Sequence, residues 1–414
     1  MTKFYHVDIW GSREDKYSYL NENDFTTIEW KEIFPTSPFY LFIPQNQDLL
    51  AEYNKYWKIT DIFPINSVGI VTARDNFAIA FDADVLRKRI EDFRNFNIND
   101  DVIAKKYEIN DTHAWKIKNS RQSLANNPEW EKYFTYCLYR PFDRRNYYHH
   151  DNLVERPRNE VMRHLLAGNN IAIYTSRQII SDSWRHSLVT NNLTDDCYVS
   201  NKSRERGYIF PLYLYPDTEN AQGTLFIERT PNLSQKFLQA IREKLGYIPT
   251  PEAIFYYIYA IFHSPTYRQI YAEFLKIDFP RLPLTSNEKL FKNLAIKGEE
   301  LVKLHLMESQ QLNRLITKYQ GEGDNNVTEV TYKPQQQRIY INKTRYFEGI
   351  PPEIWGFKIG GYQVLDKWLK DRKKANRSLS FDDILHYQKI VVVLTATLNI
   401  MQEIDKIIPD WPIK

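Results

Sequence analysis

The sequence predicts an α+β fold, in which short strands form small mixed sheets beside several long helices. Hydrophobic residues make up 43% of the 414 residues, which is enough to bury a core. The runs with strand character are short and are broken by Pro or Gly, whereas the long amphipathic runs carry helix-capping pairs. No glycine-rich fingerprint follows an early strand, so we do not expect a complete Rossmann-like core.

The first 135 residues form an α+β segment with an acidic balance. Residues 59–81 alternate β-branched and polar positions around Pro64 and Gly69, as short strands and turns do. The following run, residues 82–96, places Val85, Leu86, Ile90 and Phe93 at the spacing of one helical face. With this length, the chain is expected to divide into residues 1–135 and 136–414.

The second part begins with strands and continues with helices. Residues 171–180 and 208–215 are the clearest strands, and residues 253–262 form the most apolar run, AIFYYIYAIF. This run is about half as long as a membrane span and lies between Pro251 and Pro265, so it predicts a buried helix and no membrane partner.

Three further elements complete the second part. Thr285 and Glu288 have capping-box spacing and predict a long helix over 285–307. Residues 327–347 predict a β-hairpin with KPQQQR at its tip. Ser380 and Asp383 predict the start of a C-terminal helix over 380–408.

The near-neutral total charge of +3 hides two oppositely charged parts. Residues 1–139 carry 17 Lys and Arg against 21 Asp and Glu, which leaves 38 against 31 for the remainder. Two segments concentrate the basic surplus: residues 140–206 contain ten Arg and one Lys, and residues 355–377 contain seven basic residues and two Asp. Aromatic residues make up 15% of the chain, which favours a large partner.

Arginine in residues 140–206 is interleaved with Tyr and Trp. A guanidinium group can form two parallel hydrogen bonds with a phosphate or with the edge of guanine. The use of Arg rather than Lys therefore favours specific nucleic-acid recognition. A solvated basic face with structural ion pairs explains the same pattern equally well. In residues 357–377, Gly360 and Gly361 precede a basic helical run that could hold phosphates, although lysines that complement a helix dipole are the commoner case.

Signatures of catalysis are missing from the sequence. No phosphate-binding loop occurs, and NNPEW at 126–130 has Glu129 where an amino-methyltransferase motif needs a second proline. Cys137 and Cys197 stand alone, and MTKFYHVDIW has no signal-peptide pattern, so a reducing cytoplasm is expected. The chain is therefore not expected to be catalytic by itself.

Several blocks taken together resemble the C-terminal part of Type ISP restriction-modification enzymes. The most specific are HSPTYR to FPRLPL at 263–284 and IGGYQVLDKWLKDR at 359–372, and the resemblance extends over nearly the whole chain. In that family one polypeptide carries a nuclease, an ATP-driven translocase, an N6-adenine methyltransferase and a target-recognition domain. The resemblance implies that residues 1–135 are the methyltransferase-proximal segment and residues 136–414 the DNA target-recognition domain.

The family resemblance implies that this chain recognises a sequence in double-stranded DNA and positions a methyltransferase core, in cis or in trans. S-adenosylmethionine, ATP and magnesium would then belong to the other family domains, and no cofactor or metal is expected here. Candidate base readers are at 177–178 and 202–206, and the other candidates suit phosphates. The DNA-binding candidates are Arg140, Arg144, Arg145, Arg156, Arg158, Arg177, Gln178, Lys202, Arg204, Arg206, Lys358, Lys370, Arg372, Lys373 and Lys374.

Two alternatives remain open at the level of sequence. A metal-dependent nuclease could use His149, His150, Asp151 and Glu160, although surface roles are the commoner fate of such residues. A protein-docking module for a methyltransferase partner could use the tyrosine-rich surface and the 380–408 helix, and this role is compatible with DNA recognition.

Overall fold

A computed structural model describes residues 2–414 apart from 38–39, 114, 203–204 and 217–227. The chain divides into two compact units, Met1–Lys55 and Tyr56–Lys414. The expected boundary between residues 135 and 136 is a functional assignment and stays a prediction. Strands from both sides of it share a sheet, since β5 (Ile79–Ala80) pairs with β7 (Asp143–Tyr148).

In its described residues, the unit Met1–Lys55 contains one strand pair and two helices. β1 (Phe4–His6) pairs antiparallel with β2 (Lys31–Ile33). A capping box starts α1 (Arg13–Glu22), and an asparagine caps α2 (Gln47–Tyr53). Among the described residues of this unit, Ile33 and Tyr53 are the buried apolar side chains, so most of its aromatic rings are at least partly exposed.

A mixed four-stranded sheet begins the unit Tyr56–Lys414, in the order β10–β6–β7–β5. β6 (Phe134–Arg140) and β7 form an antiparallel hairpin whose register shifts between Leu138 and Arg140. β10 (Leu193–Thr194) runs parallel to β6. Parallel and antiparallel neighbours in one small sheet confirm the predicted mixed arrangement.

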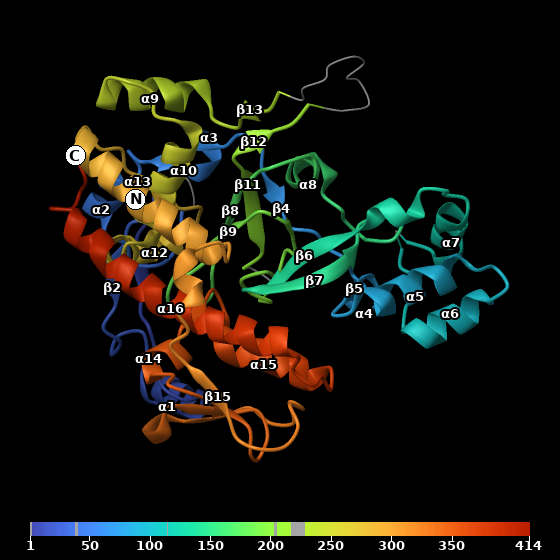
Figure 1. The fold of residues 1–414 in the computed structure, drawn as a ribbon. Coiled ribbons are helices and arrows are strands. Elements are labelled where there is room, and N and C mark those ends of the chain that lie inside the picture. The colour runs from blue at the N-terminus through green and yellow to red at the C-terminus, as the bar shows by residue number, and fades with distance from the viewer. Residues whose placement is uncertain (1, 38–39, 114, 203–204, 217–227) are drawn as a thin grey trace. The chain divides into compact units, whose positions relative to one another are not determined.

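A second four-stranded sheet lies at the centre of this unit (Figure 1). Its order is β4 (Ser67–Val68), β11 (Gly207–Pro211), β8 (Ala172–Ser176) and β9 (Ser187–Thr190), with every neighbour antiparallel. All residues of β8 and β9 are buried. α8 (Asn159–Leu166) packs against β11. The strand predicted at 171–180 is confirmed over β8, with residues 177–180 in a loop, and the strand predicted at 208–215 is divided between β11 and the separate strand β12 (Tyr213–Leu214).

Short helices beyond the β6–β7 hairpin form a helical arm (Figure 1). α5 (Ala83–Arg94) buries Leu86, Ile90 and Phe93 as predicted, but Val85 is 45% exposed. Its position lies at the edge of the apolar stripe, where the side chain turns to solvent. The other helices of the arm are α4 (Asp75–Ala78), α6 (Asp100–Tyr107) and α7 (Ile117–Ala125).

Three long helices pack together around an apolar core. α10 (Pro251–His263) packs on α13 (Glu288–His305), and α16 (Phe381–Ile407) packs on both. Gly298 allows the close crossing of α10 and α13, because a Cβ there would lie 1.8 Å from the Tyr256 carbonyl oxygen. The buried helix predicted at 253–262 is therefore confirmed.

The cap predicted for α13 is wrong, whereas the cap of α16 is confirmed. Asn287 caps α13 by accepting a hydrogen bond from the Leu290 amide, while the Thr285 hydroxyl donates to the Lys414 carbonyl oxygen. Ser380 and Asp383 form the predicted capping box of α16. By length and composition alone α16 could cross a membrane, but half of its apolar window is buried inside the protein, as in a core helix.

A third four-stranded antiparallel sheet precedes the C-terminal helices, in the order β15–β18–β17–β16. β16 (Thr331–Lys333) and β17 (Arg338–Tyr340) confirm the predicted hairpin, and η4 (Pro334–Gln336) forms its tip. β15 is Lys318–Gln320 and β18 is Tyr346–Glu348.

The remaining elements are β3 (Trp57–Lys58), α3 (Ile59–Ile62), η1 (Trp130–Tyr133), β12 (Tyr213–Leu214), β13 (Thr230–Pro231), α9 (Gln235–Leu245), α11 (Pro265–Ile270), α12 (Ala272–Leu275), β14 (Arg281–Leu282), η3 (Gln310–Asn313), α14 (Pro352–Trp355), β19 (Lys358–Ile359), β20 (Tyr362–Gln363) and α15 (Val364–Lys374).

Candidate nucleic-acid interface

Two loops leave the central sheet at the same end. The first, residues 177–186, joins β8 to β9, and the second, residues 195–206 without the undescribed positions 203–204, runs from β10 into β11. Thr175 is opposite Ser187 and Ser176 is opposite Gly207, so the three strand ends meet. The sheet therefore brings together two segments that sequence reasoning selected separately, and we call them the recognition loops.

A buried carboxylate joins the recognition loops. Glu205 is fully buried, and its Oε1 accepts hydrogen bonds from the amides of Ile180 (2.8 Å) and Ser181 (2.7 Å). Its Oε2 accepts from His186 Nε2 (3.1 Å) and from Ser200 Oγ (2.5 Å). Burial opposes ionisation, but these donors hold the pKa of Glu205 well below its ordinary value. An ionised Glu205 thus fixes both loops on a single side chain.

The glycine turn between β19 and β20 docks on the same loops. The Gly360 amide donates to the Arg185 carbonyl oxygen (2.8 Å), and the Gly361 amide donates to that of Val199 (2.9 Å). Gly360 has φ +55, and a Cβ there would lie 2.0 Å from the Val199 carbonyl oxygen, so only glycine fits this contact. The turn places the exposed Lys358 beside the recognition loops.

The recognition loops expose most of the predicted base readers. The side chains of Arg177, Lys202 and Arg206 are 49%, 42% and 50% exposed. Arg177 lies 3.4 Å from Asp278 and Arg206 lies 2.8 Å from Asp196, whereas Lys202 donates to Ser181 Oγ. Asp278 and Asp196 are buried, but the two guanidinium groups reach solvent and can contact another anion as well. Gln178 is also exposed, and Arg204 lies outside the described residues.

Three other predicted arginines lie inside the protein, which disagrees with the expectation that they face DNA. Asp195 binds Arg140 at 2.8 Å, and both side chains are buried. Asp143 receives Arg145 at 2.6 Å and Arg372 at 2.9 Å. Burial opposes ionisation of Asp143, but the charges of Arg372 and Arg145 hold its pKa below the ordinary value. Arg145 and Arg372 fix the β6–β7 hairpin to α15, and Arg140 fixes β6 to the segment after β10, so these guanidinium groups are not available to phosphate.

The remaining candidates on the hairpin and on α8 differ in accessibility. Arg144 is exposed, with its guanidinium carbon 3.6 Å from the Tyr136 ring centroid, and Arg156 is exposed as well. Arg158 is partly buried, adopts φ 59 and approaches Glu160 at 3.9 Å. Arg144 and Arg156 therefore suit a phosphate better than Arg158 does.

At the end of α15 the predicted lysines divide into paired and unpaired residues. Lys370 binds Asp366 at 2.6 Å, an i,i+4 pair on the helix surface. Lys373 and Lys374 are exposed in the last turn, and no ion pair involves them in the described parts of the chain. This end of α15 remains accessible to an anionic partner.

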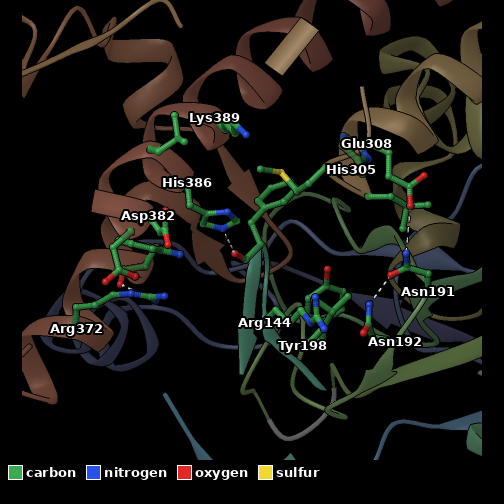
Figure 2. A pocket seen from close by; sticks show the side chains of 17 residues that line it. Arg144, Asn191, Asn192, Tyr198, His305, Glu308, Arg372, Asp382, His386 and Lys389 are labelled. Carbon is green, nitrogen blue, oxygen red and sulfur yellow. Dashed lines mark hydrogen bonds between the residues drawn. The ribbon is translucent and has the colours of Figure 1, made fainter. Parts of the chain in front are cut away.

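A cavity of about 670 Å³ contains polar residues that sequence reasoning missed (Figure 2). Asn191 and Asn192, in the turn after β9, line it together with Arg144 and Lys389. The Asn191 amide donates to Glu308 Oε1 at 3.3 Å. An asparagine amide can form two hydrogen bonds with adenine, so Asn191 and Asn192 are further candidate base readers. Their signal in the sequence is an Asn-Asn pair in a tight turn, but that pattern is common in turns without ligands.

Among the residues that the structure describes, the groups that could hold a metal do not form a suitable site. His149 contacts Asn159, and His150 accepts from the Asn152 amide. Glu160 accepts from Ser67. In the described part of the chain, one cluster has its possible ligand atoms within 4.8 Å of one another. It consists of Asp195, Asp196 and Cys197. Arg140 and Arg206 already neutralise its carboxylates, so the cluster does not fit a cation.

The chain is similar to a protein family and to several solved structures. The family model of the Type ISP C-terminal specificity domain matches residues 61–403. No curated protein matches the chain. One similar structure is a nuclease-deletion mutant of the Type ISP restriction-modification enzyme LlaGI in complex with a DNA substrate mimic. It has a TM-score of 0.71 and 20% identity, and the match covers 100% of this chain and 33% of that chain.

Two further solved structures are similar. The DrdV–DNA complex has a TM-score of 0.74 and 22% identity over 97% of this chain and 43% of that chain. The ATP-dependent Type ISP restriction-modification enzyme LlaBIII bound to DNA has a TM-score of 0.70 and 18% identity over 93% of this chain and 26% of that chain. At such identities the likeness establishes a shared fold. The chain spans less than half the length of each of these proteins.

Proposed function

The chain belongs to the Type ISP C-terminal specificity domain family, and on that premise we propose that it recognises a base sequence in double-stranded DNA. One observation carries the proposal, which is the pair of recognition loops that Glu205 joins at one end of the central sheet. A rigid scaffold that displays Arg, Gln and Lys from fixed loops meets the requirement for reading base edges.

The similar structures support the proposal. Those of LlaGI, DrdV and LlaBIII are described as complexes with DNA or a DNA substrate mimic. Direct readout requires side chains that fork base edges, and phosphate contacts set the register. Arg177, Gln178, Lys202 and Arg206 suit the first task, and Arg144, Arg156, Lys373 and Lys374 suit the second.

The proposal extends to a partner. Recognition by this chain would position an N6-adenine methyltransferase core, supplied in cis or in trans, as part of a restriction-modification system in the cytoplasm. S-adenosylmethionine, ATP and magnesium would act in the methyltransferase and nuclease-translocase domains of the family rather than in these residues. This division assigns specificity to the chain and chemistry to its partners.

Selection from a pool of random duplexes tests the proposal. We expect the protein to enrich one sequence, because the recognition loops present several different readers. Gln178→Ala should lower the free energy of discrimination at one base pair by about 1–3 kcal/mol, because a glutamine amide can form two hydrogen bonds with adenine. The matched control is Arg242→Ala, at an exposed position on α9, which should leave the enriched sequence unchanged. Absence of duplex binding at low salt would refute the proposal.

A second function, protein docking, is favoured by the unit Met1–Lys55. Trp10, Phe25 and Phe42 are 82%, 70% and 59% exposed there. Large exposed aromatic side chains are enriched where proteins bind one another. A methyltransferase polypeptide is the proposed partner, and copurification of that polypeptide with the wild-type chain, but not with Trp10→Ala, would support docking.

A further inference from the structure

A second cavity joins the root of the helical arm, which consists of α4, β5 and the start of α5, to α15 and to a recognition loop. Its volume is about 570 Å³. The β6–β7 hairpin and Asn201, of the 195–206 loop, complete the lining. Asn76, Asp82, Asn201 and Lys374 are exposed, so the cavity is open to solvent. Segments far apart in the sequence thus surround one open space beside a recognition loop.

This cavity has a surplus of positive charge. The basic side chains that line it are Arg89, Arg140, Arg145, Lys367, Lys374 and Arg377, and the acidic ones are Asp75, Asp82 and Asp371. Two carboxylates outside the lining contribute as well, because Arg140 binds Asp195, and Arg145 shares Asp143 with Arg372. Adding Arg372 and these two carboxylates gives seven cations against five carboxylates, which leaves two positive charges uncompensated.

Arg89 and Lys374 are the cations without a carboxylate partner. In the parts of the chain that the structure describes, neither has a carboxylate oxygen within 4.0 Å of its side-chain nitrogens. Arg89 Nη1 donates instead to the carbonyl oxygens of Ile79 (3.0 Å) and Phe77 (3.5 Å), which hold the guanidinium group without neutralising it. Lys374 is exposed in the last turn of α15.

The carboxylates of the lining do not compensate these two cations, because each has another partner. They are engaged in the pairs Asp82–Arg377 (2.6 Å), Asp371–Lys367 (2.5 Å) and Asp75–Tyr139 (2.8 Å). The surplus charge therefore stays with Arg89 and Lys374, at the root of the arm and at the end of α15.

Stacked arginines and aromatic rings make one wall of the cavity rigid. The guanidinium carbons of Arg140 and Arg145 lie 3.8 and 4.2 Å from the centroid of the Tyr139 ring. Those of Arg145 and Arg377 lie 4.1 and 4.7 Å from the centroid of the Phe81 ring. Arg145 thus connects two rings, and the shape of the wall is set before any ligand arrives.

An anion matches this combination of charge and shape. A cleft lined by one sign of charge focuses the electric field and concentrates ions of the opposite sign. Phosphate oxygens accept charge-assisted hydrogen bonds from guanidinium and ammonium groups alike. A preformed wall lowers the cost of ordering side chains when the ligand binds.

We propose that this cavity binds phosphate groups of a nucleic-acid backbone through Arg89 and Lys374. The assignment to nucleic acid rests on the proposed function. Because Asn201 lines the same cavity, a backbone held there sets the register of the 195–206 loop on the duplex and carries no base preference of its own. Arg89 was not among the residues predicted from the sequence, and it adds the root of the helical arm to the DNA contact surface.

The salt dependence of duplex binding tests the cavity. Lys374→Gln should weaken binding to all duplexes alike by about fivefold at fixed salt, as expected for one lost charge contact near the surface. The slope of log K against log salt should decrease in magnitude by about one, and the enriched sequence should stay the same. The matched control is Lys244→Gln, because Lys244 is also an exposed lysine in the last turn of a helix, α9. It should change neither affinity nor slope.

The side-chain N–H nuclear magnetic resonances of Arg89 test whether the cavity itself is occupied. In the wild type, a duplex should shift them and inorganic phosphate should shift them less, and Lys374→Gln should reduce both shifts. Because Lys374 is exposed, this variant should keep the wild-type stability, which urea denaturation checks.

The outcomes separate this proposal from the proposed function. If the wild type binds DNA but Lys374→Gln keeps the wild-type affinity and slope, or the duplex leaves the Arg89 resonances in place, the cavity is not a backbone site although DNA recognition stands. If the wild type binds no duplex, the proposed function fails. A shift with inorganic phosphate would then identify a free-anion site and overturn the backbone assignment, and the absence of any shift would overturn the anion site as well.

Discussion

The arginines of the β6–β7 hairpin and those of the recognition loops differ in what surrounds them. Arg140 and Arg145 are about one-tenth exposed, and each binds a buried carboxylate. Arg177 and Arg206 are about half exposed, so their guanidinium groups reach solvent although their partners Asp278 and Asp196 are buried. The comparison shows that identical side chains serve stability in one region and remain available for a ligand in the other, because burial determines the strength of each ion pair.

The largest expected effect tests the hairpin region. Asp143→Asn removes the anion that Arg145 and Arg372 share, and it leaves two poorly solvated cations without a partner. The free energy of unfolding should fall by about 3–5 kcal/mol, as for one broken buried ion pair. Urea denaturation measures this change.

The control for this variant is a more exposed ion pair in the same unit, Tyr56–Lys414. Asp82 is 54% exposed and binds Arg377 at 2.6 Å. Asp82→Asn should change the free energy of unfolding by less than about 1 kcal/mol. Equal losses in the two variants would show that burial does not distinguish the regions.

A smaller effect is expected at the carboxylate that joins the recognition loops. Glu205→Gln places an amide where five groups donate hydrogen bonds, so its NH₂ faces other donors. The free energy of unfolding should fall by about 1–3 kcal/mol, and preference for the selected DNA sequence should fall more than affinity for random duplexes. Glu353→Gln, at an exposed residue of α14, is the matched control.

The pH dependence of this variant gives an independent check. Because the folded-state pKa of Glu205 lies well below its ordinary value of 4.5, ionised Glu205 stabilises the fold above pH 4.5. That contribution decreases as the pH falls from 4.5 toward the folded-state value. The stability difference between wild type and Glu205→Gln should therefore narrow below pH 4.5. A difference that widened on acidification would contradict the assigned role.

The sequence predicted local features better than it predicted which side chains contact each other across the fold. The capping box of Ser380 and Asp383 was predictable, because its two residues are three positions apart and satisfy each other. Arg372 was assigned to DNA, but its partner Asp143 lies 229 residues away. Thr285 was assigned to a cap, but its hydroxyl donates a hydrogen bond to the carbonyl oxygen of Lys414, 129 residues away. Tertiary contacts of this kind have no periodic signal, and they decided which basic residues stayed exposed.

The smallest effect on stability, and the sharpest contrast with Asp143→Asn, is expected for Arg206→Gln. Its partner Asp196 is almost fully buried, but the arginine itself is half exposed and water can replace it. We expect the free energy of unfolding to change by less than about 1 kcal/mol. Affinity for the selected duplex should nevertheless fall about tenfold, because one forked contact to a base or phosphate is lost. Binding titrations and urea denaturation of the same preparation measure both quantities. If stability falls as far as in Asp143→Asn while DNA binding persists, Arg206 belongs with the structural arginines and the two regions do not differ in the way we propose.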